Sequence, residues 1–153
     1  MKRLFLFCST LLLPLVACQP ATLQLSIKAP SGTNQGRPLY MLVRKVDPKQ
    51  YATESYDDVS ARAFQPDASV LHKEIIYPGT LRRIPVKIPE DSSLAVSFLF
   101  TAPDGNWQSF LNMPVPQDLD VELQESRILS GGSAAPPPAE AAASPAAPTP
   151  SKS

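Results

Sequence analysis

The stretch Ser93–Thr101, SLAVSFLFT, is the most hydrophobic segment that follows residue 17. A nearly continuous apolar run of this length, rich in residues that favour strands, is typical of a strand that is buried on both faces. Turn-forming residues bound it on both sides, at Pro89–Ser92 and at Ala102–Asn106. The second of these contains Asp-Gly, a strong hairpin signal. We therefore predict a central strand over residues 93–101.

The segments on either side predict its neighbours in a sheet. Trp107–Met113 follows the hairpin loop and is expected to return beside the central strand. In Thr80–Ile88 the apolar residues Ile84, Val86 and Ile88 occupy every second position, and Pro85 lies between the first two of them. Because proline has no N–H to donate to a neighbouring strand, this segment is expected at a sheet edge or with a bulge.

Four further segments have the pattern of strands. Thr22–Ala29 alternates strictly between apolar and polar residues, as a half-buried strand does. Leu39–Val46 begins with five apolar residues, which predicts a more buried strand, and Ser69–Tyr77 precedes a Pro-Gly turn. Apolar and polar residues also alternate over Leu119–Leu123, which predicts a last strand that begins there and extends at most to Leu129.

Residues 50–64 have a different pattern. Their apolar residues recur at spacings of three to five, which favours one or two short helical turns. Turn signals about every ten residues, around seven strands and little helix favour an all-β fold. We predict a two-sheet antiparallel β-sandwich with a small helical insertion.

The first residues have the layout of a secretory signal. A basic tip, Lys2-Arg3, precedes an apolar run of about a dozen residues, too short for the roughly 20 that a membrane-spanning helix needs. The order Leu15-Val16-Ala17-Cys18 resembles the lipobox of bacterial lipoproteins and fits an Ala-x-Ala cleavage site less well. The resemblance implies cleavage before Cys18, a diacylglycerol on its sulfur and an acyl group on its nitrogen. An ordinary secretory signal with an incidental Cys18 is the alternative.

These patterns divide the chain into four parts. We expect a signal peptide over residues 1–17, a lipidated tether over 18–21, a β-sandwich domain over 22–129 and a disordered tail, rich in Ala and Pro, over 130–153. In the lipoprotein family an Asp after the cysteine retains the protein in the inner membrane. Gln19 stands there instead, so the periplasmic leaflet of the outer membrane is the expected location.

Charge and composition exclude several classes of function. Removal of residues 1–17 takes 2 of the 14 basic residues, which leaves 12 against 14 acidic ones and a net charge of −2. Such a surface has no electrostatic footprint for nucleic acid. Cys8 lies in the removed segment and Cys18 would carry lipid, so stability must come from a hydrophobic core rather than a disulfide.

Ionisable groups are too few to predict catalysis or metal binding. His72 is the only histidine, and its strand pattern favours a surface or partly packed position. Asp57-Asp58, with Glu54, Asp67 or Asp91, lacks the spacing of a calcium loop and is interpreted as solvated loop charge. Trp107 is interpreted as a core residue. We predict no enzyme activity, no small-molecule substrate, no metal and no cofactor other than the covalent lipid.

The order of these features is similar to the outer-membrane lipoproteins of the type VI secretion system, the TssJ-like family. The similarity spans about residues 15–129 and rests on the order in which several motifs follow one another. They are the lipobox, the alternating first strand, Pro38-Leu39-Tyr40-Met41-Leu42-Val43-Arg44, the aromatic and acidic segment 51–64, Tyr77-Pro78-Gly79, Ala95-Val96-Ser97-Phe98, and Trp107.

This resemblance implies a transthyretin-like sandwich that is tethered through Cys18 to outer-membrane lipid. It further implies a scaffold that docks on the periplasmic part of the inner-membrane TssM-type protein, through the loop between the first two strands. That loop, Pro30–Arg37, supplies seven candidate contact residues: Ser31, Gly32, Thr33, Asn34, Gln35, Gly36 and Arg37. A pilotin-like assembly lipoprotein of another envelope complex is the alternative, and a periplasmic hydrolase or carbohydrate-binding domain is a third hypothesis.

Overall fold

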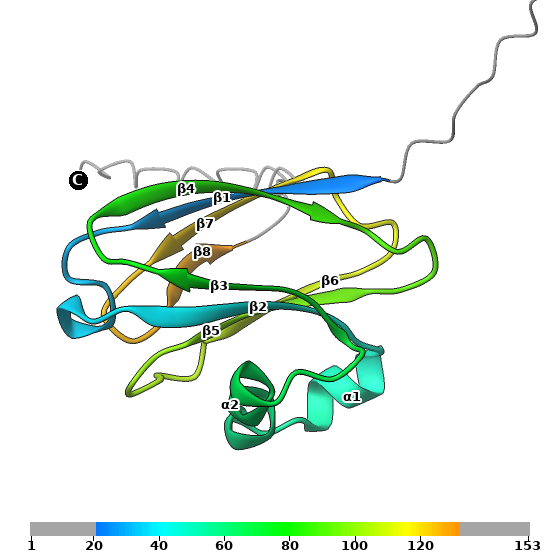
Figure 1. Ribbon diagram of the computed structural model, residues 1–153, viewed down its shortest axis with the longest axis horizontal. Coiled ribbons are helices and arrows are strands. Elements are labelled where there is room, and N and C mark those ends of the chain that lie inside the picture. The colour runs from blue at the N-terminus through cyan, green and yellow to red at the C-terminus, as the bar shows by residue number, and fades with distance from the viewer. Residues whose placement is uncertain (1–20, 132–153) are drawn as a thin grey trace, which may run out of the picture.

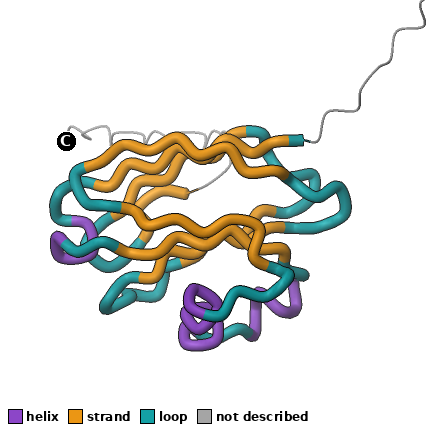
Figure 2. Tube along the Cα trace, viewed as in Figure 1, coloured by secondary structure: helices purple, strands orange, loops and turns teal. Residues whose placement is uncertain are grey.

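Residues 21–131 are described by the structure, a computed structural model, and form two four-stranded sheets that pack face to face (Figures 1 and 2). The first sheet has the strand order β4 (Thr80–Lys87), β1 (Thr22–Ala29), β7 (Asp118–Leu123), β8 (Ile128–Gly131). The second sheet has the order β3 (Val70–Ile76), β2 (Leu39–Lys45), β5 (Leu94–Leu99), β6 (Gln108–Leu111). The predicted β-sandwich is thereby confirmed.

The main core lies between the two sheets and follows from the alternation of side chains along the strands. In β1, Leu23, Leu25 and Ile27 are completely buried, and the residues between them face outward. They pack against inward residues of the opposite sheet, such as Met41 and Phe98. Because side chains of a strand alternate between its faces, the period-two pattern of residues 22–29 predicted this face correctly.

β5 lies between β2 and β6 and is buried on both faces, as the apolar run of residues 93–101 predicted. Val96 and Phe98 enter the main core, whereas Ala95 and Ser97 are fully buried on the opposite face. Two short helices, α1 (Pro48–Thr53) and α2 (Tyr56–Phe64), lie on this outer side of the second sheet (Figure 1). Because the helices cover this outer side, β5 has no face that is exposed to solvent and polar.

Side chains that cap the helices fix where each begins. Asp47 accepts hydrogen bonds from the amides of Lys49 and Gln50, both at 2.9 Å, at the start of α1. Ser55 and Asp58 form a reciprocal capping box at the start of α2. The prediction of helical turns within residues 50–64 is confirmed. No helix within residues 21–131 has the length and apolar character needed to cross a bilayer.

A buried ion pair attaches the helical insertion to the second sheet. The Arg44 side chain in β2 is completely buried, and its Nη1 and Nη2 donate to the two Glu54 carboxylate oxygens at 3.1 and 2.8 Å. Arg62 and Gln50 also contact Glu54, at 2.9 and 2.7 Å. The interpretation of Glu54 as a solvated loop charge was therefore wrong, because its side chain is only 7% exposed.

The charge of Glu54 is maintained by its partners. Burial is the largest single influence and raises the pKa of this carboxyl, but the hydrogen bonds from Arg44 and Gln50 and the positive charges of Arg44 and Arg62 together lower it further than burial raises it. The net effect is a pKa below the ordinary value. Glu54 is consequently ionised at neutral pH and compensates the charge of the buried Arg44.

Two more of these carboxylates, Asp58 and Asp67, serve as local hydrogen-bond acceptors. Asp58 caps α2, and hydrogen bonds from the Ser69 hydroxyl and amide, with Arg62 nearby, lower the pKa of Asp67 to about 2. Within residues 21–131 no three His, Cys, Asp or Glu residues gather in a way that could hold a metal ion.

Three details of the strand arrangement differ from, or refine, the sequence predictions. β1 and β7 pair in parallel, whereas every other pair is antiparallel, because the whole second sheet lies between them in sequence and returns the chain to the same end. Residues 128–131 form a separate strand, β8, antiparallel to β7, so the described sheet ends at Gly131 rather than at 129. β4 is an edge strand, as Pro85 predicted.

Candidate docking site

The loop Pro30–Arg37 joins the two sheets at the end of the sandwich opposite the start of β1 (Figure 1). It contains the short 3₁₀ segment η1 (Thr33–Gly36). Three consecutive residues, Asn34, Gln35 and Gly36, have φ values of +49°, +57° and +76°, in the left-handed region. Asparagine and glycine tolerate this region better than most residues, so the sequence Asn-Gln-Gly favours the tight turn.

The side chain of Asn34 holds this loop in place. Its Nδ2 donates to the carbonyl oxygens of Arg37 and Pro38, at 3.2 and 3.1 Å. Its Oδ1 accepts from the amide of Thr101, at 2.7 Å, in the connection that follows β5. Asn34 therefore links the loop to the second sheet and is only 2% exposed.

Two of the seven loop residues predicted to contact a partner are buried. Thr33 is 1% exposed and Asn34 is 2% exposed, so both side chains offer almost no accessible surface to a partner in this conformation of the loop. The other five, Ser31, Gly32, Gln35, Gly36 and Arg37, are exposed. The sequence could not separate the two groups, because Thr and Asn are polar residues that usually lie on the surface.

Replacement of Asn34 by alanine is expected to lower the free energy of unfolding by about 2–3 kcal/mol. The variant leaves the Thr101 amide without its acceptor and places an alanine in the left-handed region. Chemical denaturation measures the change. The control is Gln35→Gly in the same turn, which removes an exposed side chain and is expected to stay within about 1 kcal/mol of wild type. Equal stability of Asn34→Ala and wild type would show that the loop does not depend on this side chain.

The turn between β7 and β8 lies beside this loop and is attached to it. The Asn34 amide donates to the Gln124 carbonyl at 3.4 Å, and the Gln124 amide donates to the Arg127 carbonyl at 2.9 Å, which closes the turn. Arg127 forms an ion pair of 3.0 Å with Asp104 in the β5–β6 loop. Three connections, at residues 30–37, 100–107 and 124–127, are thus joined into one end surface.

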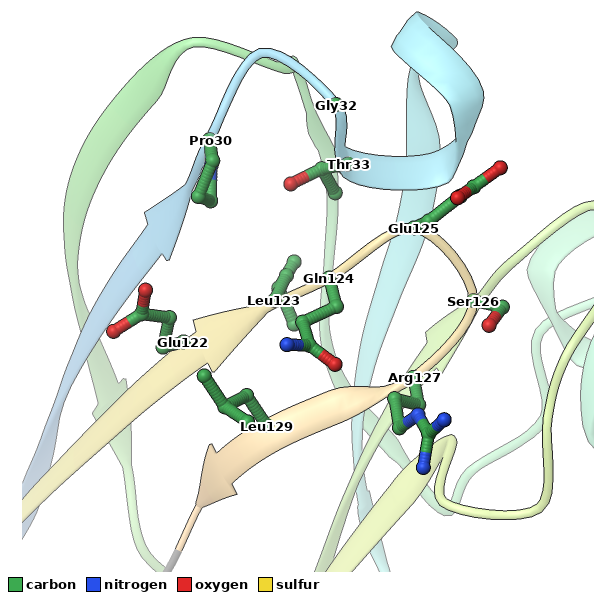
Figure 3. Close-up of a pocket in the computed structure, with 10 residues that line it drawn as sticks. All are labelled: Pro30, Gly32, Thr33, Glu122, Leu123, Gln124, Glu125, Ser126, Arg127 and Leu129. Atoms are coloured by element: carbon green, nitrogen blue, oxygen red, sulfur yellow. The ribbon is translucent and has the colours of Figure 1, made fainter.

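A cavity of about 520 Å³ opens between the first and third of these connections (Figure 3). Pro30, Gly32 and Thr33 line it from the loop after β1, and the end of β7, the turn and Leu129 of β8 line it from the other side. The Thr33 Oγ1 is buried and has no hydrogen-bond partner among the described residues. We call this cavity and its rim the end groove.

The groove combines one exposed apolar side chain with a polar rim. Leu129 is 55% exposed. Glu122 is paired with Lys28 at 3.0 Å, and Glu125 is exposed at the turn. The residues that line the groove include no histidine and no cysteine, the side chains that most often serve as general base or thiol nucleophile. This arrangement is suited to binding a polypeptide surface.

The remaining candidate residues have structural positions. His72 Nε2 lies 3.2 Å from Glu74, which also pairs with Arg82, so His72 is a partly exposed strand residue, as predicted. Trp107 is partly buried and packs against the main core and against a second buried cluster, which consists of Leu42, Val59 and Ala63. Its ring packs edge-on against the Tyr56 ring, with 5.0 Å between the ring centroids. The interpretation of Trp107 as a core residue agrees with these contacts.

Cys18 lies outside the described residues, so its lipidation stays a prediction. The turn at residues 124–127 was not predicted from the sequence, because the end of the last strand was left open as far as Leu129. The run Gln124-Glu125-Ser126-Arg127, four polar residues between Leu123 and Ile128, was the signal that could have identified it.

Comparison with known proteins places this fold in a defined class. The crystal structure of the type VI secretion lipoprotein TssJ1 from Pseudomonas aeruginosa has a TM-score of 0.59 and 18% identity, over 76% of this chain and 99% of that one. The membrane-bound type VI secretion component Lip from Serratia marcescens has a TM-score of 0.60 and 16% identity, over 75% and 99%. A chain in the structure of the TssM C-terminal domain from EAEC has a TM-score of 0.59 and 15% identity, over 73% and 98%.

These similarities define the molecule as a small β-sandwich with the fold of type VI secretion lipoproteins, which confirms the resemblance seen in the sequence. No curated protein matches the sequence. The sequence does match the family described as IglE, N-terminal domain, over residues 40–123, more than half of the chain. The protein belongs to this family.

Proposed function

We propose that this protein is a lipid-anchored outer-membrane component of a type VI secretion membrane complex, and that it docks on the periplasmic part of the inner-membrane TssM-type protein. Its family and its shared fold with secretion lipoproteins support this assignment. The occurrence of a similar chain in a structure of the TssM C-terminal domain supports the choice of partner. Cys18, in its lipobox-like context, supplies the anchor.

The observation that carries the docking role is the end groove. A hydrogen bond from the Asn34 amide to the Gln124 carbonyl connects its two walls, and a second bond closes the turn 124–127, so little ordering is needed when a partner binds. Leu129 offers an apolar anchor, and the polar residues around it resemble the rim of a protein interface. The exposed part of the predicted docking loop, including Arg37, extends this surface.

The test is a binding measurement with the purified periplasmic domain of the TssM-type protein from the same genome. Leu129→Asp is expected to weaken binding at least tenfold, about 1.4 kcal/mol, because it places a charge at the apolar centre of the contact. Calorimetry gives the affinity. The matched control is Leu81→Asp, since Leu81 is 68% exposed on β4, at the other edge of the same sheet, and its replacement is expected to leave the affinity unchanged.

Two outcomes separate the parts of this proposal. If Leu129→Asp binds as tightly as wild type, the docking surface lies elsewhere on the molecule. If the wild-type protein does not bind the TssM-type domain, and deletion of its gene mislocalises an outer-membrane channel while contractile secretion continues, the pilotin-like alternative replaces the proposal.

A further inference from the structure

A second groove, of about 560 Å³, opens at the opposite end of the sandwich, where the described chain begins. Ala21 lines it directly, together with residues 88–90 and 92 from the β4–β5 connection and residues 113–115 from the β6–β7 connection. These three segments lie at the same end of the sandwich (Figure 1). We call this the entry groove.

The entry groove is mainly apolar. Ile88 belongs to the main core and Val115 packs against it, so the floor is firmly packed, whereas Met113 is 51% exposed at the surface. Pro89 and Pro114 form part of the wall. Because proline has no backbone N–H, these two residues remove donors that would otherwise require water or another acceptor.

The distance from the groove to the proposed anchor is short. Ala21 is three residues from Cys18, and three residues of fully extended chain span at most about 11 Å. The acyl chains on Cys18 would lie in the bilayer, whose headgroup layer is roughly 5–8 Å thick on each side. The tether is therefore too short to hold the entry groove far from the membrane surface.

We propose that the entry groove seats the domain on the bilayer, with Met113 inserted among the lipid headgroups of the leaflet that holds the acyl chains. This inference rests on the lipid anchor of the proposed function. β1 runs from the entry groove to the loop 30–37 over 8 residues, about 26 Å at the usual rise of a strand. The seated domain therefore presents the end groove to the periplasm, facing away from the outer membrane.

Apolar contact, rather than attraction between charges, holds the entry groove on the bilayer. Glu90 lines the entry groove and Asp91 follows it, so anionic lipids would be repelled rather than attracted. Exposed charges interact over about 10 Å at 0.1 M salt and over less at higher salt. We therefore expect that neither lower salt nor a larger share of anionic lipid strengthens the seating.

The experiment uses the full acylated protein in nanodiscs of phosphatidylethanolamine with a minor share of phosphatidylglycerol. A single cysteine, introduced as Ser92→Cys at the entry groove or as Gln35→Cys at the opposite end, carries a nitroxide label. The lipid consumes the thiol of Cys18, and Cys8 lies in the cleaved segment, so only the introduced cysteine reacts. Collision rates with oxygen, which enters lipid, and with a water-soluble nickel complex report the environment of each label.

The Ser92→Cys label is expected to have a ratio of oxygen to nickel accessibility several-fold higher than the Gln35→Cys label. Adding Met113→Asp is expected to lower the ratio at residue 92 to the value at residue 35, with acylation unchanged by mass spectrometry. Leu81→Asp, which also places an aspartate at an exposed apolar position, is expected to leave the ratio unchanged. The comparison of the two labels in the otherwise wild-type protein does not depend on the Met113 variant being stable.

Equal nickel accessibility of the two labels in a fully acylated protein would overturn the seating and leave the proposed function intact. A protein that carries no acyl chains in mass spectrometry would overturn the anchor, and with it both proposals. A ratio at residue 92 that Met113→Asp and Leu81→Asp reduce equally would show that the entry groove has no specific part in membrane contact.

Discussion

Replacement of Cys18 by serine is expected to abolish incorporation of a clickable palmitate analogue and to move the protein from the membrane fraction to the soluble periplasmic fraction. A serine oxygen cannot provide the thioether on which the diacylglycerol is built. Two or more acyl chains give stable anchoring, and each buried methylene contributes about 0.8 kcal/mol, so their removal leaves no comparable attachment. Metabolic labelling followed by fractionation measures both effects.

The matched control for this change is Cys8→Ser. Cys8 lies in the segment that the signal peptidase would remove, so this variant is expected to keep its label and its membrane location. The thermal unfolding midpoint of Cys18→Ser is expected to equal that of the wild type, because the core consists of residues within 21–131. Palmitate label retained on the Cys18→Ser protein would refute lipidation at this position.

Replacement of Glu54 by glutamine is expected to lower the free energy of unfolding by about 3 kcal/mol or more, with a fall in the unfolding midpoint of more than about 10 °C. The reason is the completely buried Arg44 side chain, whose charge Glu54 compensates through two hydrogen bonds. Removing one partner of such a pair leaves a buried charge without compensation. Chemical denaturation measures the free energy of unfolding, and calorimetry measures the unfolding midpoint.

Glu125→Gln is the matched control, since Glu125 is exposed at the β7–β8 turn and has no ion pair among the described residues; its replacement is expected to change stability by less than about 0.5 kcal/mol. The double variant Arg44→Met/Glu54→Leu removes both charges and is expected to regain most of the stability lost in Glu54→Gln. A double variant as unstable as the single one would mean that lost packing, rather than the uncompensated charge, causes the effect.

The sequence alone predicted much of the sandwich, because strands with one buried face have a simple period. Residues 22–29 alternate strictly and form β1 with the bounds that the pattern predicts. The apolar run 93–101 contains the doubly buried β5. Pro85 placed β4 at an edge for the reason that applies to any proline in a sheet.

Features that depend on contacts between distant segments could not be predicted in this way. The parallel pairing of β1 with β7 depends on where the chain returns after the whole second sheet, which no local period encodes. Arg44 stands in a strand pattern as an ordinary polar residue, and only the placement of α1 and α2 over β2 buries it against Glu54. Local periodicity identifies faces, but it does not identify which element covers each face.

The candidate docking site likewise has one part that the sequence predicted and another that depends on contacts between distant segments. The position of the loop 30–37 between the first two strands was predicted from the sequence, and its role in docking came from the family resemblance. The burial of Thr33 and Asn34 depends on bonds to Thr101 and to the turn at Gln124, which are distant in sequence. The end groove exists because the turn at residues 124–127 approaches the loop.

Flotation tests most directly the central claim that one molecule is held by lipid at one end and binds a secretion partner at the other. Vesicles that carry the acylated protein are mixed with the soluble periplasmic domain of the TssM-type protein and centrifuged through a density gradient. The partner domain is expected to float with vesicles that carry the wild-type protein, and to stay at the bottom with vesicles prepared with Cys18→Ser or Leu129→Asp. A partner domain that stays at the bottom in the presence of fully acylated wild-type protein would contradict the account.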